Sequence, residues 1–339
     1  MIKKIKALLQ NVRVILSRLF VSPLKTYYFT GRLFWNDYRQ FMLYSSSVKM
    51  LDKECFIARI VMTYHVIEKG LTMPKKRLDF GHETVYDLMR QVDEYEKLFG
   101  RSEANVDYAA GVVKEYLALH ERSNFPINQE DAFWKRVMNF CKSHADIPCS
   151  KQVSTTRDAF FKDINASFPV FAASRHTCRH YEGPLPLEIV ESAVKLAMTA
   201  PSACNRQHAR VHCVSNHQTR DVIFTLQNGN RGFAKDADKL LVVTSDLNDL
   251  RWHEERNDIY TNAGMFLMNL CYALHYHKVA HCVLNWSVSP EADRKLHDLL
   301  GIGMNERPVA LVCCGPMPER VELAASPRKK FEDIFTNHE

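Results

Sequence analysis

The chain has 339 residues, of which 46% are hydrophobic and 25% are charged, and its formal net charge at pH 7 is +6. This is ordinary globular composition with enough length to bury a core, and with only 12 glycines a collagen-like or glycine-linker chain is excluded. The ten cysteines include no Cys-x-x-Cys pair and several lie in apolar runs, which indicates a reduced, cytoplasmic protein rather than a disulfide framework.

Residues 1–50 are the first of three regions that we distinguish. Through residues 2–20, apolar residues recur at helical spacing between basic ones, and no acidic residue precedes Asp37. Charge interrupts this stretch too often for it to span a bilayer. Such a helix either docks on a protein surface or lies on an anionic membrane, so residues 1–36 are a candidate for peripheral contact with the inner face of the membrane. Residues 21–50 mix aromatic residues with cations, but we favour a packed amphipathic helix and expect no nucleic-acid partner.

The second region, residues 51–165, is predicted to be all-helical. Amphipathic patterns indicate four helices, at residues 52–68, 79–99, 105–122 and 129–144. His65 and Glu68 are three residues apart and share a helix face, a spacing that suits a metal or an acid/base pair. No second pair of matching spacing lies nearby, so we expect no metal. Gly70 is interpreted as the end of the first helix.

The third region, residues 166–339, follows a connector at residues 146–170. Helical patterns at 187–199, 258–277 and 290–300 alternate with strand patterns at 210–215, 239–245, 280–286 and 308–314. This alternation predicts an α+β fold in which helices and strands share one domain. Cys313 and Cys314 are adjacent in an apolar strand, so their side chains should enter the core on opposite faces of the sheet.

Three separated segments of this region carry the residues that suit chemistry. Arg175 and Arg179 are four residues apart, and guanidinium groups form bidentate bonds to phosphate oxygens. A helix end then breaks into residues 200–207, Ala-Pro-Ser-Ala-Cys-Asn-Arg-Gln, whose amide side chains both donate and accept hydrogen bonds, as a ring with mixed edges requires. The third segment is the tail, residues 326–334, whose basic cluster could fold back onto the same anion.

The order of these segments resembles the FMN-dependent nitroreductase family. The resemblance rests on Ser-Arg-x-x-x-Arg-x-Tyr from Ser174, on Ala-Pro-Ser-Ala-x-Asn-x-Gln from Ala200, and on the strand and helix patterns after residue 258. It covers residues 168–339 and implies a nitroreductase-like central sheet sandwiched by helices, preceded here by the helical region. It also implies a homodimer with FMN at the interface. A His-x-x-Glu-Lys-Gly-Leu stretch at residues 65–71 resembles a subgroup associated with surface-polysaccharide gene clusters.

The resemblance assigns cofactor contacts residue by residue. Arg175 and Arg328 would hold the FMN phosphate, with Thr177 close by, and Arg179 would approach the pyrimidine end of the ring. The remaining contacts would be made along the ring, the ribityl chain and the reactive N5 face by Pro201, Ser202, Asn205, Gln207, Asn230, Leu284 and Asn285. Pro201, Ser202 and Asn205 would come from the partner subunit. Packing is the favoured role of Cys178 and Cys204 within these motifs.

The implied activity is hydride transfer from NAD(P)H through FMN to a nitro, quinone or other small electron acceptor. The cofactor carries out this chemistry, so we assign no catalytic side chain and no metal. Four positions depart from the family pattern: Thr177 replaces Ser, His208-Ala209 replaces Pro-Trp, Asn285-Trp286 replaces Glu-Gly and Lys330 replaces Pro. Two alternatives stay open, namely a dedicated flavin-dependent biosynthetic enzyme and a non-catalytic flavin-binding protein at the membrane face.

Overall fold

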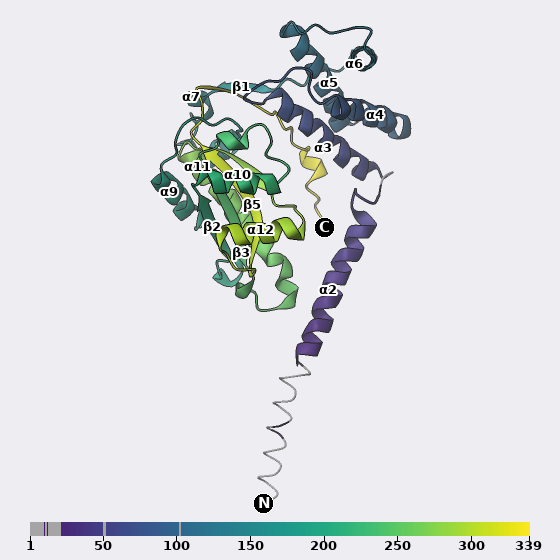
Figure 1. Cartoon of the computed structure of the whole chain (residues 1–339). Helices are drawn as coiled ribbons and strands as arrows, with labels where there is room; N and C mark the ends of the chain where they lie inside the picture. The colour runs from purple at the N-terminus through teal and green to yellow at the C-terminus, as the bar shows by residue number, and fades with distance from the viewer. Residues whose placement is uncertain (1–9, 11, 13–21, 50–51, 102) are drawn as a thin grey trace, which may run out of the picture.

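The computed structural model describes residues 10, 12, 22–49, 52–101 and 103–339. Most of the basic helix expected at residues 2–20 therefore lies outside the described residues. The rest of the chain forms a helical layer that lies beside a mixed domain of helices and strands, while one long helix, α2, projects from both (Figure 1). In the described part, no helix is long and apolar enough to cross a membrane.

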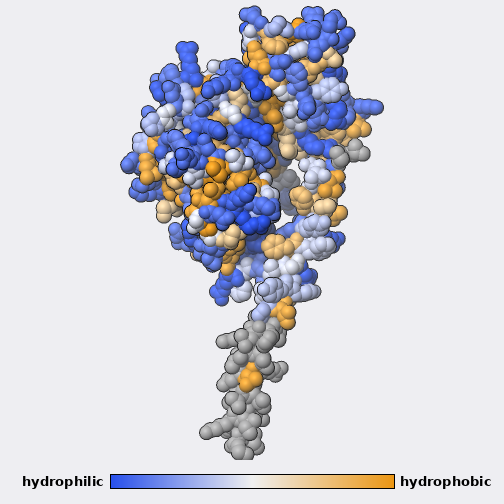
Figure 2. Space-filling model, in the orientation of Figure 1, coloured by the Kyte–Doolittle hydropathy of each residue, from blue (hydrophilic) through white to orange (hydrophobic). Residues whose placement is uncertain are grey.

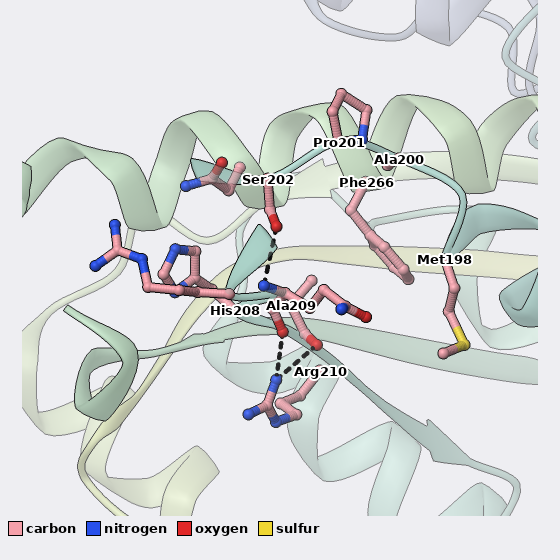
Figure 3. A pocket seen from close by; sticks show the side chains of 11 residues that line it. Met198, Ala200, Pro201, Ser202, His208, Ala209, Arg210 and Phe266 are labelled. Carbon is pink, nitrogen blue, oxygen red and sulfur yellow. Dashed lines mark hydrogen bonds between the residues drawn. The ribbon is translucent and has the colours of Figure 1, made fainter. Parts of the chain in front are cut away.

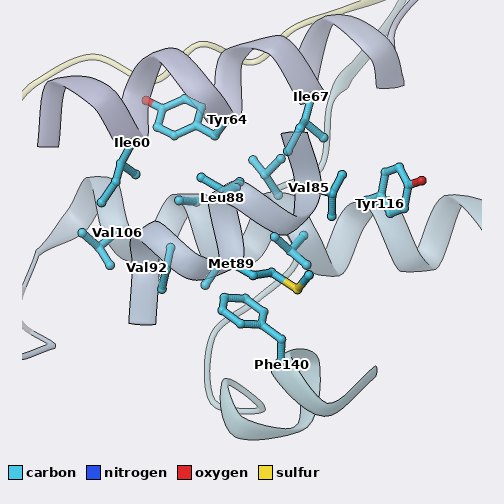
Figure 4. Packing of buried hydrophobic residues seen from close by; sticks show 14 of the residues in the cluster. Ile60, Tyr64, Ile67, Val85, Leu88, Met89, Val92, Val106, Tyr116 and Phe140 are labelled. Atoms are coloured by element: carbon cyan, nitrogen blue, oxygen red, sulfur yellow. The ribbon is translucent and has the colours of Figure 1, made fainter. Parts of the chain in front are cut away.

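The helical layer consists of four helices, which confirm the predicted ones: α3 (Lys53–Leu71), α4 (His82–Phe99), α5 (Ala104–Arg122) and α6 (Ala132–Ser143). Two helix starts are fixed by aspartates, since Asp52 accepts a hydrogen bond from the amide of Cys55 and Asp131 accepts one from that of Phe133. The layer has its own core, in which large buried side chains interlock between the helices (Figure 4): Ile60, Ile67, Leu88, Met89, Tyr116 and Phe140. Tyr95 is buried in the same core.

Gly70 does not end α3, as the sequence suggested, because the helix continues through Leu71 and Thr72 caps it. The glycine is instead a point of close packing. A Cβ atom at this position would lie 2.1 Å from the ring of Phe80. The absence of a side chain at Gly70 therefore lets the segment before α4 pack directly onto α3.

The mixed domain is built on a sheet of four antiparallel strands in the order β2 (Ala209–Val214), β3 (Lys239–Asp246), β5 (Glu306–Gly315) and β4 (Ala280–Asn285). Helices α9 (Leu187–Ala197) and α11 (Asp258–Tyr276) contribute to the core on one face. Helices α10 (His217–Leu226) and α12 (Pro290–Leu300) contribute to the core on the other. Cys313 faces the second core and Cys314 the first, as predicted, and the α+β fold class is confirmed.

The connector predicted at residues 146–170 contains regular structure that the sequence did not reveal. Strand β1 (Val153–Thr156) pairs antiparallel with β6 (Arg320–Leu323), and two short helices follow, α7 (Arg157–Phe160) and α8 (Phe168–Ser174). This small second sheet returns the C-terminal tail to the helical layer. The domain boundary at residue 166 stays a prediction. Short 3-10 turns complete the chain at η2 (Ala203–Asn205), η3 (Ala234–Asp236), η4 (Leu247–Asp249), η5 (His253–Asn257) and η6 (Phe331–Asp333).

Helix α2 (Ser22–Tyr44) is helical as expected but is not packed along its length. Its attachment to the mixed domain is local: Arg256 of η5 donates two hydrogen bonds, at 2.6 and 2.7 Å, to the carboxylate of Asp37, and Phe29 stacks on His253. The aromatic side chains of the opposite face are exposed, and Figure 2 shows hydrophobic residues on the surface of this projecting helix. The prediction of a packed helix over residues 21–50 is therefore wrong for the aromatic residues.

Candidate functional site

The first predicted motif runs as an extended segment beside the start of β4. The amide of Cys178 donates a hydrogen bond at 3.0 Å to the carbonyl of His281, and the hydroxyl of Tyr181 donates to the carbonyls of Cys178 and Cys313. Cys178 and Tyr181 are buried in the sheet core. These contacts fix the backbone; Arg175, Thr177 and Arg179 are half-buried, whereas His180 is buried and His176 is exposed.

Arg175 lies at the C-terminal end of α8 among buried histidines. Its Nε is buried and has no hydrogen-bond partner, and within the described chain its guanidinium forms no ion pair. Burial lowers the pKa of His281 to about 4, and the positive charge of Arg175 contributes to this shift. Arg175 is thus a positive charge beside histidines with lowered pKa values, and the described residues form no ion pair with it.

The tail brings a second arginine to the same place. The exposed Arg328 donates a hydrogen bond at 2.7 Å to the carbonyl of Ser326, which curls the tail locally. Burial lowers the pKa of His176, and the charges of both Arg175 and Arg328 lower it further. Two arginines that are 153 positions apart in the sequence (328 − 175) therefore lie within electrostatic range of the same histidine, His176. The structure brings together the first and third predicted segments, and Thr177 is half-buried between the two arginines of its motif.

Arg179 points toward the helical layer. Its Nη2 lies 3.5 Å from Nε2 of His65, its guanidinium lies 5.8 Å from the ring centroid of Phe233, and its Nε is buried without a partner. Cys282 of β4 contributes a thiol to the same surroundings, because Arg179 is among the groups that lower its pKa while burial raises it. The contact with His65 was not foreseen from the sequence, although the His-x-x-Glu-Lys stretch had drawn attention.

The second motif forms a rigid loop at a separate cavity of about 440 Å³ (Figure 3). Pro201, Ser202 and Gln207 line this cavity, and Asn205 is exposed beside it. Asn205 and Gln207 both adopt positive φ angles of 54°, as does the exposed Cys204 at 51°, a conformation that non-glycine residues adopt rarely and mostly under constraint. The hydroxyl of Ser202 accepts a hydrogen bond at 2.9 Å from the Gln207 amide, which closes the loop.

An ion pair between Arg206 and Glu255 anchors the loop at residues 201–207 to the turn η5. Arg206 donates hydrogen bonds at 2.8 and 3.0 Å to the two carboxylate oxygens of Glu255, and this pairing lowers the pKa of Glu255 to about 2. The amide of Ala203 donates at 2.9 Å to the side chain of Asn262 on α11. The strained backbone is thus held by charge-assisted bonds from the adjoining turn and helix.

His208 is a member of this cavity that sequence reasoning treated only as a departure from the family pattern. Its side chain is fully buried, and neither ring nitrogen has a hydrogen-bond partner. The nearest carboxylate oxygen, on Asp249, lies 3.8 Å from Nδ1. Because buried polar atoms are normally bonded, His208 has unused hydrogen-bonding capacity at the cavity wall.

The remaining predicted residues form a third group around the end of β4. Gln227 joins them: its Nε2 donates at 3.2 Å to the side chain of Asn285, and its backbone carbonyl accepts a hydrogen bond from the amide of Asn230. Asn230 also donates at 2.8 Å to the carbonyl of Phe224, so its amide organises its own loop. The side chain of Leu284 is buried in the sheet core, whereas that of Asn285 is exposed.

The groups are not continuous within one chain. Among the described residues, no hydrogen bond or ion pair joins residues 201–207 to Arg175, Arg179 or Arg328. The arginine cluster offers cations and buried unpartnered donors that fit the phosphate and the electron-rich edge of a flavin, while the loop at 201–207 offers amide and hydroxyl groups. Among the residues that the structure describes, no cluster of histidine, cysteine and carboxylate side chains is arranged to hold a metal ion.

The fold and site describe an α+β domain with a cationic cluster at the edge of its sheet. The family model of the nitroreductase family matches residues 172–226, the segment that contains both predicted cofactor motifs. The resemblance seen in the sequence is thereby confirmed for this part of the chain, and it supports the general assignment to oxidoreductases of the nitroreductase type. No curated protein matches the chain.

Several solved structures are similar to about half of the chain. A nitroreductase family protein from Streptococcus pneumoniae is 19% identical, with 51% of this chain and 100% of that chain covered and a TM-score of 0.44. A nitroreductase family protein from Clostridium difficile is 16% identical, with 49% and 95% covered and a TM-score of 0.40. A provisionally named NAD(P)H:FMN oxidoreductase from Staphylococcus epidermidis is 14% identical, with 51% and 96% covered and a TM-score of 0.45.

Proposed function

We propose that this protein is an FMN-dependent oxidoreductase that transfers a hydride from NAD(P)H to a nitro, quinone or other small electron acceptor. The observation that carries the proposal is the buried Nε of Arg175, which has no hydrogen-bond partner, in a guanidinium that forms no ion pair in the described chain. Arg328 of the tail lies within electrostatic range of the neighbouring His176. Such a site suits a phosphate, which takes charge-assisted bonds from guanidinium groups. When bound, FMN would supply the hydride chemistry, and the protein would bind and orient it.

The side chains divide this work by position. Arg175, Thr177 and Arg328 would hold the phosphate at the junction of α8 and the tail. Arg179 would place its charge at the pyrimidine end of the ring, where negative charge gathers on reduction and a fixed cation stabilises it. Asn230, Leu284 and Asn285 would bound the ring at the end of β4. No side chain is assigned to proton transfer.

The loop at residues 201–207 would serve the site of a second copy of the chain. Pro201, Ser202, Asn205 and Gln207 lie apart from the arginine cluster within one protomer, which a shared dimeric site would explain. Apolar side chains beside this loop are exposed, including Leu196, Met198, Met265 and Met268 on or next to α9 and α11. A homodimer interface at this surface would remove these apolar side chains from water. A monomer by light scattering at micromolar concentration would contradict this arrangement.

The absorbance spectrum of the purified protein, loaded with FMN, tests the proposal. Bound flavin should give a yellow protein whose absorbance near 450 nm bleaches on addition of NADH or NADPH, each added separately without oxygen. Protein that stays colourless after incubation with excess FMN and desalting would refute the proposal. Arg175→Gln and Arg328→Gln should weaken FMN binding, whereas Arg294→Gln, an exposed site on α12, should not.

Two other functions would use the same flavin site. Tight FMN binding with bleaching, but no turnover with any generic quinone or nitroarene, would favour a dedicated biosynthetic enzyme. Flavin that neither nicotinamide reduces would favour a non-catalytic flavin-binding protein at the membrane.

We also propose that the protein lies on an anionic membrane surface through residues 1–36 and the exposed face of α2, on the cytoplasmic side. Aromatic and aliphatic residues follow helical spacing along this face: Leu24, Tyr27, Phe34, Trp35, Tyr38, Phe41 and Met42. Lys25, Arg32 and Arg39 recur every seven residues and flank it. Exposed aromatic residues beside a row of cations suit the interface of a bilayer with anionic headgroups.

A further inference from the structure

The last turns of α3 face the mixed domain with two basic side chains. His65 and Lys69 are four residues apart, so they lie on the same face of the helix. Nε2 of His65 lies 3.5 Å from Nη2 of Arg179, the residue assigned to the pyrimidine end of the flavin. The helical layer therefore reaches the proposed cofactor site of its own chain.

Glu68 fixes this face of α3. Its carboxylate is fully buried and accepts hydrogen bonds from the hydroxyl of Tyr108 at 2.6 Å and from the backbone amide of Ser326 at 3.2 Å. It also bonds Nδ1 of His65 at 3.0 Å. The Glu68 carboxylate is thus held by hydrogen bonds from a second helix, from the tail and from its own helix.

The bond to Glu68 sets the direction of the His65 ring. A carboxylate accepts, so Nδ1 of His65 carries the hydrogen and Nε2 presents its lone pair. A guanidinium only donates, so this lone pair is matched to Nη2 of Arg179. Successive hydrogen bonds, from Tyr108 to Glu68 and from His65 to Glu68, thus hold the guanidinium end of the Arg179 side chain.

Lys69 brings a second charge to the same place. It is half-buried, and the described part of the chain provides no ion-pair or hydrogen-bond partner for its ammonium group. Burial lowers its pKa, and the charge of Arg179 lowers it further, while the thiol of Cys282 acts in the opposite direction. Lys69 is therefore within electrostatic range of both Arg179 and β4.

The charges around this point do not balance. In the described residues, neither Lys69 nor Arg179 is paired with a carboxylate, and the one carboxylate beside them, that of Glu68, is already bonded to three groups. Half-buried like charges without a counter-ion repel each other and lose hydration. An anionic or electron-rich ligand edge between them would relieve both effects.

We propose that α3 completes the flavin site in cis, with Lys69 as a second cation beside Arg179 at the pyrimidine edge and His65 as a positioning residue for Arg179. The inference rests on the proposed FMN function. It assigns a cofactor role to the helical layer, which the nitroreductase match at residues 172–226 does not include. A charge at this edge stabilises the reduced, anionic ring more than the oxidised one.

The test is the midpoint potential of bound FMN, measured by reductive titration against a reference dye. Lys69→Gln should weaken the binding of reduced FMN relative to oxidised FMN by about tenfold, which appears as a more negative potential. Lys69→Arg keeps the charge and should retain most of the wild-type potential. Lys97→Gln removes an exposed lysine from α4 and should leave the potential unchanged.

His65→Phe should shift the potential in the same direction, whereas His65→Asn, which keeps an acceptor, should shift it less. Circular dichroism melting of each variant separates these effects from unfolding. If wild-type protein binds no FMN, the proposed function itself fails. If it binds FMN and Lys69→Gln and Lys69→Arg both leave the potential at the wild-type value, only the cis contribution of α3 is overturned.

Discussion

The buried carboxylate of Glu68 accepts a hydrogen bond at 3.2 Å from the backbone amide of Ser326. A helix in the first quarter of the chain thereby holds the start of the C-terminal tail, two residues before Arg328. The tail has a second attachment, because the amide of Ala325 donates at 3.0 Å to the side chain of Gln152. The position of Arg328 thus depends on residues far from the nitroreductase match.

Replacing Glu68 should therefore affect both stability and the tail. Glu68→Ala leaves the Tyr108 hydroxyl and the Ser326 amide without their partner, and the free energy of unfolding should fall by about 2–4 kcal/mol. Urea unfolding followed by circular dichroism measures this change. Limited proteolysis should also cut the tail faster. Glu130→Ala, at an exposed loop, is the control, and equal effects of the two substitutions would contradict the role of Glu68.

Gly70 and Gly31 form a matched pair of helical glycines. Gly70→Ala would place Cβ 2.1 Å from the ring of Phe80 and should destabilise the protein by about 1–3 kcal/mol through overpacking. Gly31 has no atom within 4 Å of the same position, so Gly31→Ala should be neutral or stabilising by up to about 1 kcal/mol. Thermal melting of both variants gives the comparison. Adding Phe80→Leu should recover part of the loss in Gly70→Ala, and no recovery would place the strain elsewhere.

The ion pair between Arg206 and Glu255 can be tested by comparing Glu255 with the adjacent Glu254. Glu255→Gln removes the charge that holds Arg206 and should loosen the strained loop at 203–207, so FMN affinity should fall by about tenfold. Fluorescence titration of FMN measures the dissociation constant. Glu254→Gln changes an exposed carboxylate, 67% accessible, on the adjacent residue and should leave the affinity unchanged. Unaltered affinity in Glu255→Gln would show that the loop does not need this support.

Much of the fold could be predicted because its elements have strong local patterns. The helices at α3 and α11 and the strand at β5 follow from apolar periodicity, and Asp52 marks the start of α3 as a capping residue should. Strands β1 and β6 are four residues each and pair across more than 150 positions, so no local pattern identifies them. The exposed aromatic residues on the face of α2 opposite Phe29 show the opposite failure. Their spacing is that of a buried face, but the described chain leaves them exposed.

The candidate site was predictable where it lies on contiguous motifs. Arg175, Arg179 and the loop at 201–207 are apparent from their spacing, and the tail at Arg328 from its basic cluster. Lys69 and His208 were missed as site residues because their significance depends on tertiary neighbours. The significance of Lys69 depends on the absence of a carboxylate that pairs with it, and that of His208 on two buried ring nitrogens without hydrogen-bond partners.

Stability should fall in mild acid because of the histidines beneath Arg175. Burial lowers the pKa of both His275 and His281 to about 4, below the ordinary value near 6.5. The unfolded chain therefore binds more protons between pH 6.5 and pH 4. The stabilisation by the neutral histidines is fully present above pH 6.5 and is lost as the pH falls toward 4.

Urea unfolding between pH 7.5 and pH 4.5 measures this dependence. Each histidine should contribute at most about 1.4 kcal/mol per pH unit to the slope of the unfolding free energy. His281→Gln should flatten the slope, whereas His338→Gln, at the exposed C-terminus, should not. A slope that is the same in wild type and His281→Gln would mean that His281 does not stay neutral in the folded protein.

Binding to lipid vesicles tests the exposed face of α2. Wild-type protein should sediment with vesicles containing phosphatidylserine and less with neutral phosphatidylcholine vesicles, because the flanking cations add to the apolar contacts. Phe34→Ser combined with Trp35→Ser should weaken binding by about tenfold or more, since two large apolar side chains no longer enter the interface. Replacing Lys25, Arg32 and Arg39 by Gln should remove the preference for anionic lipid.

The control for this experiment is Tyr86→Ser, which removes an exposed aromatic residue from α4 on the helical layer. It should bind vesicles like the wild type. Removal of residues 1–36 should abolish binding, because it takes away the basic segment and most of the aromatic face. If the Phe34/Trp35 variant binds like the wild type but forms fewer dimers in light scattering, the face covers a second copy of the chain and the membrane proposal is wrong.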